Sequence, residues 1–131
     1  MPDIDVEIHI PISPTRLFLR QVHYLAASLR RWGGPLAESP IIVTVGDDCE
    51  PRDLYRENPW ARGYPISFAW TPRELFQKYG YFGTVIERYR QPFRARNVLM
   101  LDADIIVVRD FTELLERVSA DPAVYAMVAH S

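Results

Sequence analysis

The sequence predicts an α/β domain in which a mostly parallel sheet is flanked by crossover helices. Strand and helix signals alternate along the chain, which is typical of parallel strands joined by helices. Hydrophobic residues make up 48% of the 131 residues, enough to fill the core of one domain of ordinary size. Because no repeat, low-complexity tract or linker divides the chain, we expect a single domain over residues 1–131.

Each expected strand is a short apolar run closed by turn residues. Residues 5–10 alternate polar and apolar side chains, and the segment Pro11-Ile12-Ser13-Pro14 then interrupts the pattern. The fourth strand is the most apolar, and we expect it to be central in the sheet and buried on both faces. The later strands are expected at 41–45, 66–70, 97–101 and 124–128, with a further extended stretch at 105–108.

Helical spacing of apolar residues predicts the segments that connect the strands. The longest covers 15–31 and ends at Gly33-Gly34-Pro35. Another is expected to start with Thr71 as its N-cap and Pro72 at its first position. The remaining helical segments are expected at 53–57, 81–90 and 112–119.

Composition and charge exclude several classes of partner and compartment. The 15 basic and 17 acidic residues leave a net charge of -2, so there is no broad basic field for nucleic acid or an anionic membrane. The single cysteine, Cys49, excludes an internal disulfide and a cysteine-based metal cluster. No apolar run reaches the roughly 18 residues of a transmembrane segment, and the start lacks a signal-peptide pattern. We therefore expect a cytoplasmic protein.

The last residues of the sequence, AVYAMVAHS, have the pattern of a strand with no cap or following helix. We therefore expect the 131 residues to be the N-terminal part of a longer protein.

Two aspartates, Asp102 and Asp104, interrupt the apolar segment VLMLDADIIVV at residues 98–108. Aspartate is rarely buried unless it is paired, because an isolated buried charge is costly. In an extended backbone both side chains would point to one side, with their Cα atoms about 6–7 Å apart. That separation lets both carboxylates reach one hard cation, Mg²⁺ or Mn²⁺. They would lie at the carboxyl end of a strand, where open α/β sheets bind their ligands.

Other interpretations of the polar residues stay open. Asp102 could cap its strand while Asp104 faces water in a tight turn. Asp47 ends the second strand, where an acid often binds a ribose or a base, but it could equally belong to a solvated turn. Of the histidines, His9 is expected to be structural, whereas His130 would end the last strand on the ligand side of the sheet.

The stretch NVLMLDADIIVVRDFTEL resembles the signature of nucleotide-sugar glycosyltransferases with the GT-A fold, especially the glycogenin-like and bacterial lipopolysaccharide glycosyltransferase group. IHIPIS, followed by a helix that ends in ASLRRW, is similar to the first strand and helix of that family, and IIVTVGDD to its second strand. The resemblance implies a Rossmann-like sheet, a Mn²⁺ or Mg²⁺ cofactor, a nucleotide-diphosphate sugar donor with UDP-sugar favoured, and an unknown acceptor. The resemblance also implies a C-terminal half that supplies most acceptor contacts, and we expect that half to lie outside these 131 residues.

The resemblance also assigns roles to individual residues. Asp102 would contact the ribose or the metal, and Asp104 would be a direct metal ligand. The turn Pro11-Ile12-Ser13 would lie along the base and the ribose, and the small side chain of Ala103 would leave space for the nucleotide. Many members carry an Arg or Lys on the helix before the D-x-D strand, near the position that Gly83-Thr84 occupies here. Neither Lys78 nor Arg88 aligns with the position of that basic residue in the family. The resemblance assigns no catalytic residue.

Three other functions remain as alternatives. One is a truncated or degenerate domain that binds a nucleotide without transferring a sugar. A haloacid-dehalogenase-like phosphatase also has an apolar strand followed by D-x-D, but that motif normally opens the domain, whereas here it lies near the end. A receiver-type signalling domain would need an acidic pair after the first strand, which here ends in Pro11-Ile12-Ser13.

Overall fold

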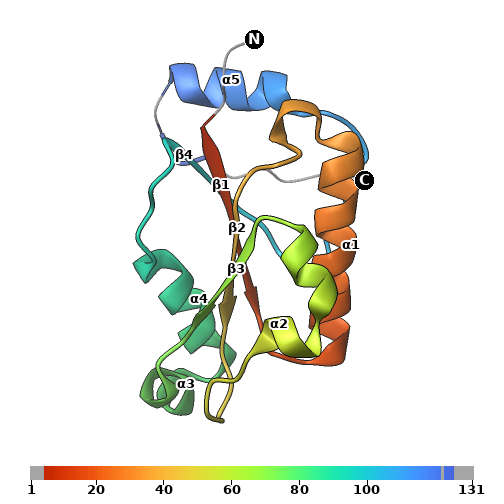
Figure 1. Cartoon of the computed structure of the whole chain (residues 1–131). Coiled ribbons are helices and arrows are strands. Elements are labelled where there is room, and N and C mark those ends of the chain that lie inside the picture. The colour runs from red at the N-terminus through yellow and green to blue at the C-terminus, as the bar shows by residue number, and fades with distance from the viewer. Residues whose placement is uncertain (1–4, 122, 126–131) are drawn as a thin grey trace.

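A computed structural model, which describes residues 5–121 and 123–125, contains one four-stranded sheet with helices on both faces (Figure 1). The strands are β1 (Val6–Ile12), β2 (Ile41–Val45), β3 (Ile66–Trp70) and β4 (Asn97–Met100). They are all parallel, in the order β3-β2-β1-β4. The prediction of an α/β fold with a Rossmann-like parallel sheet is therefore confirmed.

β4 is an edge strand of the described sheet, contrary to the prediction that it is central, and β1 and β2 are the inner strands. Ile8 in β1 is paired with Ile41 of β2 on one side and with Leu99 of β4 on the other. All seven residues of β1 are buried, whereas the four residues of β4 are only half-buried. Within the described part of the chain β4 pairs with β1 alone, so its second edge and part of its faces stay open.

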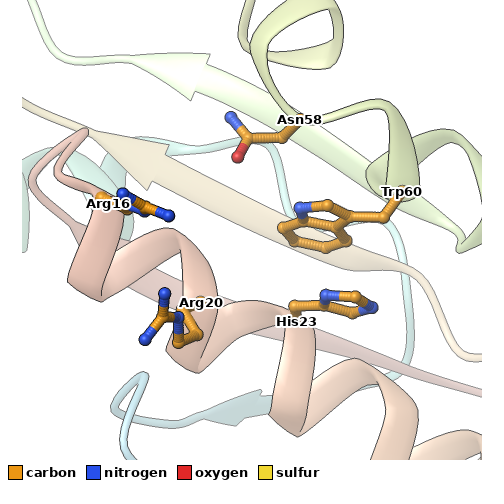
Figure 2. Close-up of a pocket in the computed structure, with 5 residues that line it drawn as sticks. All are labelled: Arg16, Arg20, His23, Asn58 and Trp60. Atoms are coloured by element: carbon orange, nitrogen blue, oxygen red, sulfur yellow. The ribbon is translucent and has the colours of Figure 1, made fainter.

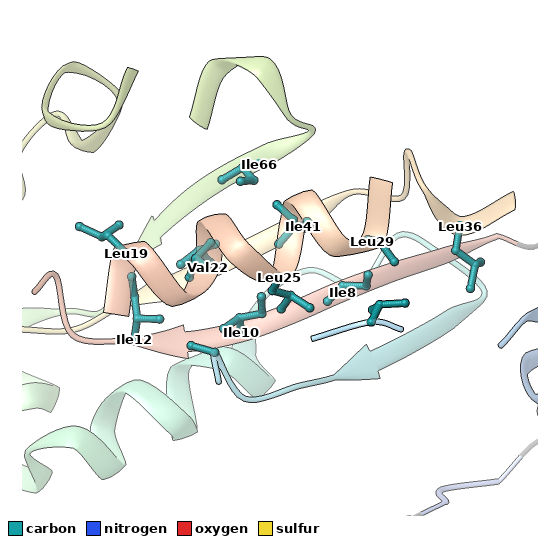
Figure 3. Close-up of a cluster of buried hydrophobic side chains, with 14 of the residues drawn as sticks. Ile8, Ile10, Ile12, Leu19, Val22, Leu25, Leu29, Leu36, Ile41 and Ile66 are labelled. Atoms are coloured by element: carbon teal, nitrogen blue, oxygen red, sulfur yellow. The ribbon is translucent and has the colours of Figure 1, made fainter. Parts of the chain in front are cut away.

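Helix α1 (Arg16–Trp32) covers one face of the sheet. The hydroxyl of Thr15 accepts a hydrogen bond from the backbone N–H of Phe18 at 3.2 Å, which caps the helix. The apolar side chains of the helix recur at helical spacing and pack against alternate residues of β1 (Figure 3). The buried residues of this interface include Leu19, Val22, Leu25, Leu29, Ile8, Ile10 and Ile12.

The connection from β2 to β3 lies on the same side of the sheet as α1 (Figure 1). It consists of α2 (Leu54–Glu57) and the 3₁₀ segment η2 (Pro59–Gly63). The side chain of Asp53 accepts hydrogen bonds from two backbone N–H groups at the start of α2. The short 3₁₀ segment η1 (Gly34–Leu36) follows α1.

Helices α3 (Arg73–Tyr79) and α4 (Tyr81–Arg90) cover the other face (Figure 1). Gly80 joins them with φ +60°, a conformation that suits glycine. The expected bounds of α4 are confirmed, but the expected cap of α3 is wrong. Its first residue is Arg73, Pro72 is at the N-cap, and the buried hydroxyl of Thr71 has no hydrogen-bond partner among the described residues.

The chain after β4 does not form a second extended strand. Residues 105–108 are unpaired in the sheet, and the N–H of Val107 donates to the hydroxyl of Ser28 on α1 at 2.9 Å. Helix α5 (Thr112–Ala120) then lies across the end at which the strands begin (Figure 1). Most of the strand expected at 124–128, and His130, lie outside the described residues. None of the helices in the described ranges is long and apolar enough to cross a membrane.

Candidate functional site

The D-x-D segment lies at the point where the strand order of the sheet reverses. β1 leads through β2 to β3 in one direction, and the chain then crosses back to place β4 on the other side of β1. Because the strands are parallel, the end of β1 at Pro11-Ile12-Ser13 and the end of β4 at Asp102-Ala103-Asp104 meet at one edge. Open α/β sheets bind ligands at such a reversal. The structure thus brings together the two segments that the sequence analysis selected.

The two aspartates are exposed, so neither is a buried charge that needs compensation, and Asp104 faces water in a turn, as one of the open interpretations expected. The strand ends at Met100, and Ala103 and Asp104 form a turn. Only Ala103 is buried, at 4% exposure, where it joins the hydrophobic core. No described residue donates a hydrogen bond or forms an ion pair with either carboxylate. The turn is thus anchored by Ala103, and it presents two free carboxylates to solvent.

The phenol of Tyr81 lies beside this turn. It donates a hydrogen bond to the carbonyl oxygen of Pro11 at 3.1 Å. Burial raises the pKa of Tyr81, and the negative charges of Asp102 and Asp104 raise it further, while the positive charge of Arg88 opposes them. The charges of the turn after β4 and of α4 therefore act together on the phenol of Tyr81 at the end of β1.

Arg88 is the buried cation of this edge, and the sequence analysis did not assign it. Its side chain is only 8% exposed, its Nη1 donates to the carbonyl oxygen of Leu101 at 3.4 Å, and its Nε has no partner among the described residues. Helical spacing could have indicated Arg88, because Tyr81, Thr84 and Arg88 occupy positions i, i+3 and i+7 and therefore share one face of α4.

The other predicted site residues take different positions. Pro11 and Ile12 are buried, and the side chain of Ile12 faces the core under α1, so only Ser13 is half-exposed at the edge. Asp47 uses its carboxylate within its own turn, where it accepts from the N–H of Asp48 at 2.9 Å and from the thiol of Cys49 at 3.5 Å. Since β2 lies on the opposite side of β1 from β4, Asp47 is separated from the D-x-D turn by a strand.

His9 is a buried structural residue, as expected. Its Nε2 lies 3.1 Å from Oε1 of Glu7, and that carboxylate also accepts from the backbone N–H groups of Arg94 and Ala95. Both side chains line a groove of about 460 Å³ on the face of the sheet opposite α1. The alternation at residues 5–10 therefore does not produce a solvated polar face, because Glu7 and His9 are buried and paired with each other through Nε2 of His9, while Nδ1 of His9 has no partner among the described residues.

The donor set of the D-x-D turn fits a hard divalent cation only in part. Carboxylate oxygens are the ligands that Mg²⁺ and Mn²⁺ prefer, and Mg²⁺ is often held by one or two carboxylates with substrate phosphates and water. Across the described ranges, no group of three or more His, Cys, Asp or Glu side chains is arranged to hold a metal ion. Asp102 and Asp104 therefore offer two exposed carboxylates, and the described residues do not enclose a cation around them.

Comparisons of the chain with models of known protein families, with curated proteins and with solved structures give no significant match. The fold and the geometry of this edge are therefore the basis for a functional assignment.

Proposed function

We propose that this chain is the donor-binding domain of a metal-dependent glycosyltransferase that uses a nucleotide-diphosphate sugar. The observation that carries the proposal is the exposed Asp102-Ala103-Asp104 turn at the strand-order reversal between β1 and β4. Two free carboxylates at this position favour a ligand that brings its own cation and phosphates.

The charges around the turn support a diphosphate rather than a neutral ligand. Asp102 and Asp104 would hold Mn²⁺ or Mg²⁺, which would neutralise the charge on a leaving diphosphate. The guanidinium of Arg88 supplies a second positive charge beside Leu101. Tyr81 fixes α4 to the end of β1 and so positions Arg88 next to the turn.

In such a transfer, the bond between the anomeric carbon of the sugar and a diphosphate oxygen breaks, and the nucleoside diphosphate leaves with the electron pair. An acceptor hydroxyl forms the new bond and loses its proton. A UDP-sugar is the favoured donor because of the resemblance of the D-x-D segment to the glycogenin-like group. The acceptor is not specified by the described residues.

A domain that binds a nucleotide without transferring a sugar is the second candidate. The lack of a third carboxylate or histidine ligand in the described part of the chain favours it. The two candidates differ in one measurable respect, because only the transferase releases UDP from a UDP-sugar in the presence of an acceptor or of water.

A calorimetric titration of the whole chain with UDP tests the proposal. We expect binding in Mn²⁺, loss of binding in EDTA, and affinity at least about tenfold lower for Asp104→Asn, the usual scale for a charge-assisted contact. Glu116→Gln is the matched control, because it also removes an exposed carboxylate but lies on α5 at the opposite edge. Absence of UDP binding, or binding that neither EDTA nor Asp104→Asn changes, would contradict the proposal.

A further inference from the structure

A small cavity with two arginines lies between α1 and the segment that joins β2 to β3. Arg16, Arg20 and His23 occupy positions i, i+4 and i+7 of α1 and form one stripe on the helix surface. Asn58 and Trp60 form the opposite wall (Figure 2). The cavity has a volume of about 160 Å³.

The walls of this cavity are held in place by contacts that involve no ligand. The imidazole of His23 stacks on the indole of Trp60, with a centroid distance of 4.1 Å and an interplanar angle of 4°. The side-chain nitrogen of Asn58 donates to the carbonyl oxygen of Leu54 at 3.0 Å, and its oxygen points toward the cavity (Figure 2). The two guanidinium groups gather on the other side of the same space (Figure 2).

The positive charge of the cavity is uncompensated by protein groups. Neither Arg16 nor Arg20 forms an ion pair or a hydrogen bond with another described residue, whereas Arg30 on the same helix pairs with Glu38 at 3.2 Å. The first turn of α1 contains no acidic residue. Both arginines are exposed. Arg16 opposes the helix dipole at the first position of α1, and the two cations repel one another across one turn, so folding alone does not favour this pair.

We infer that this cavity binds the phosphate group of a small phosphomonoester. Guanidinium groups match phosphate oxygens in geometry and form strong, charge-assisted hydrogen bonds with them. The cavity is smaller than the roughly 300–1,000 Å³ of a site for a drug-sized ligand, so it suits a single anionic group. Arg16, Arg20 and His23 belong to α1, whereas Tyr81 and Arg88 belong to α4, and the two helices cover opposite faces of the sheet (Figure 1). The inferred phosphate site therefore does not rest on the proposed donor site.

Titration of the full chain with phenyl phosphate and with inorganic phosphate, both in EDTA, tests the inference. We expect saturable binding of both probes, weakened about tenfold by Arg16→Gln and by Arg20→Gln. Arg31→Gln, which removes the same charge from the same helix, should change the affinity less than about twofold. Asp104→Asn should leave phosphate binding intact, which separates this site from the donor site.

The wild-type chain provides a second readout that does not depend on the variants folding. In the nitrogen-15 spectrum of arginine side chains, phenyl phosphate should shift the Nε–H signals of Arg16 and Arg20 and leave that of Arg31 in place. Absence of binding, equal shifts at Arg31, or equal weakening by Arg31→Gln would overturn the inference. Binding to phosphatidylcholine vesicles that contain phosphatidic acid, without binding to phenyl phosphate, would also overturn it, because the ligand would then be a lipid surface.

Discussion

The phenol of Tyr81 donates a hydrogen bond to the carbonyl oxygen of Pro11 at 3.1 Å and joins α4 to the end of β1 across 70 residues of sequence. This contact holds α4 over the edge of the sheet from which Asp102 and Asp104 project. Because both aspartates act on the same phenol, the ionisation of Tyr81 reports on the state of the D-x-D turn.

We expect Asp102→Asn and Asp104→Asn each to lower the pKa of Tyr81, because each removes a negative charge that disfavours the phenolate. A cation bound at the turn should lower this pKa in the same way. Ultraviolet difference titration, with Tyr81→Phe subtracted, measures the effect. The pKa of Tyr81 is higher in the folded protein than its ordinary value of 10.0. The contribution of the neutral phenol to folding stability is therefore fully present below pH 10.0 and is lost as the pH rises through the pKa of the folded state. A Tyr81 pKa that neither substitution moves would argue against this coupling.

Arg88→Gln should weaken UDP binding in Mn²⁺ by about tenfold, because it removes a charge-assisted contact from the donor site. The control is Arg90→Gln on the same helix, since Arg90 is exposed and pairs with Glu87 at 3.5 Å. Calorimetry gives the affinities, and circular dichroism shows whether each variant is folded. Equal UDP affinity in folded Arg88→Gln and wild type would exclude a role for this arginine in donor binding.

Gly46→Ala should destabilise the protein by about 1–3 kcal/mol, the usual cost of overpacking a core. A Cβ atom at residue 46 would overlap Oγ1 of Thr84 and lie 2.9 Å from its Cβ, so α4 would have to shift. Gly63→Ala is the control, because a Cβ there meets no atom within 4 Å. In a double-mutant cycle measured by urea unfolding, Thr84→Ala should reduce the cost of Gly46→Ala. Equal costs in both backgrounds would refute the clash.

Glu7→Ala should cost about 1–3 kcal/mol for each buried donor that it leaves unsatisfied. The carboxylate accepts from His9 and from the backbone N–H groups of Arg94 and Ala95, so it links β1 to the segment before β4. Glu7→Gln keeps one oxygen acceptor and should cost less. Urea unfolding measures both, and exposed Glu116→Ala should change stability by less than about 0.5 kcal/mol. A loss for Glu7→Ala no larger than that of Glu116→Ala would show that the network is unimportant.

Protonation of Asp110 should make the folding stability of the domain decrease as the pH becomes acidic. The hydroxyl of Thr112 and then its backbone N–H donate to the carboxylate and lower the pKa of Asp110 below its ordinary 3.8. The stability that this interaction contributes is present when the pH is above the pKa of Asp110 in the unfolded chain. It is lost as the pH falls through the lower pKa that Asp110 has in the folded protein. Asp110→Asn should therefore flatten the decrease in melting temperature below about pH 4, while Glu116→Gln should leave it unchanged. A decrease as steep as in the wild type would contradict this assignment.

Local signals predicted many elements with the correct bounds. The strands β2 and β3 and helix α4 agree with the expected ranges, because apolar spacing and the Gly and Pro residues that follow are properties of neighbouring residues. The same signals failed at Thr71, where Thr71 and Pro72 fit the start of a helix with a threonine cap, but the structure does not form that cap. They left the backbone after Asp102 open between an extended segment and a tight turn, and the structure forms the turn at Ala103 and Asp104, with Ala103 packed into the core.

The α/β fold and the apolar strand before the D-x-D segment could be predicted without the structure, since both depend on residue order and local periodicity. The folded structure was needed to show that β1 is an inner strand and β4 an edge strand, that Arg88 lies beside the D-x-D turn, and that Arg16 and Arg20 line one cavity with Trp60. These relationships join segments far apart in the chain, and they depend on hydrogen-bond pairing of strands and on packing that local spacing does not encode.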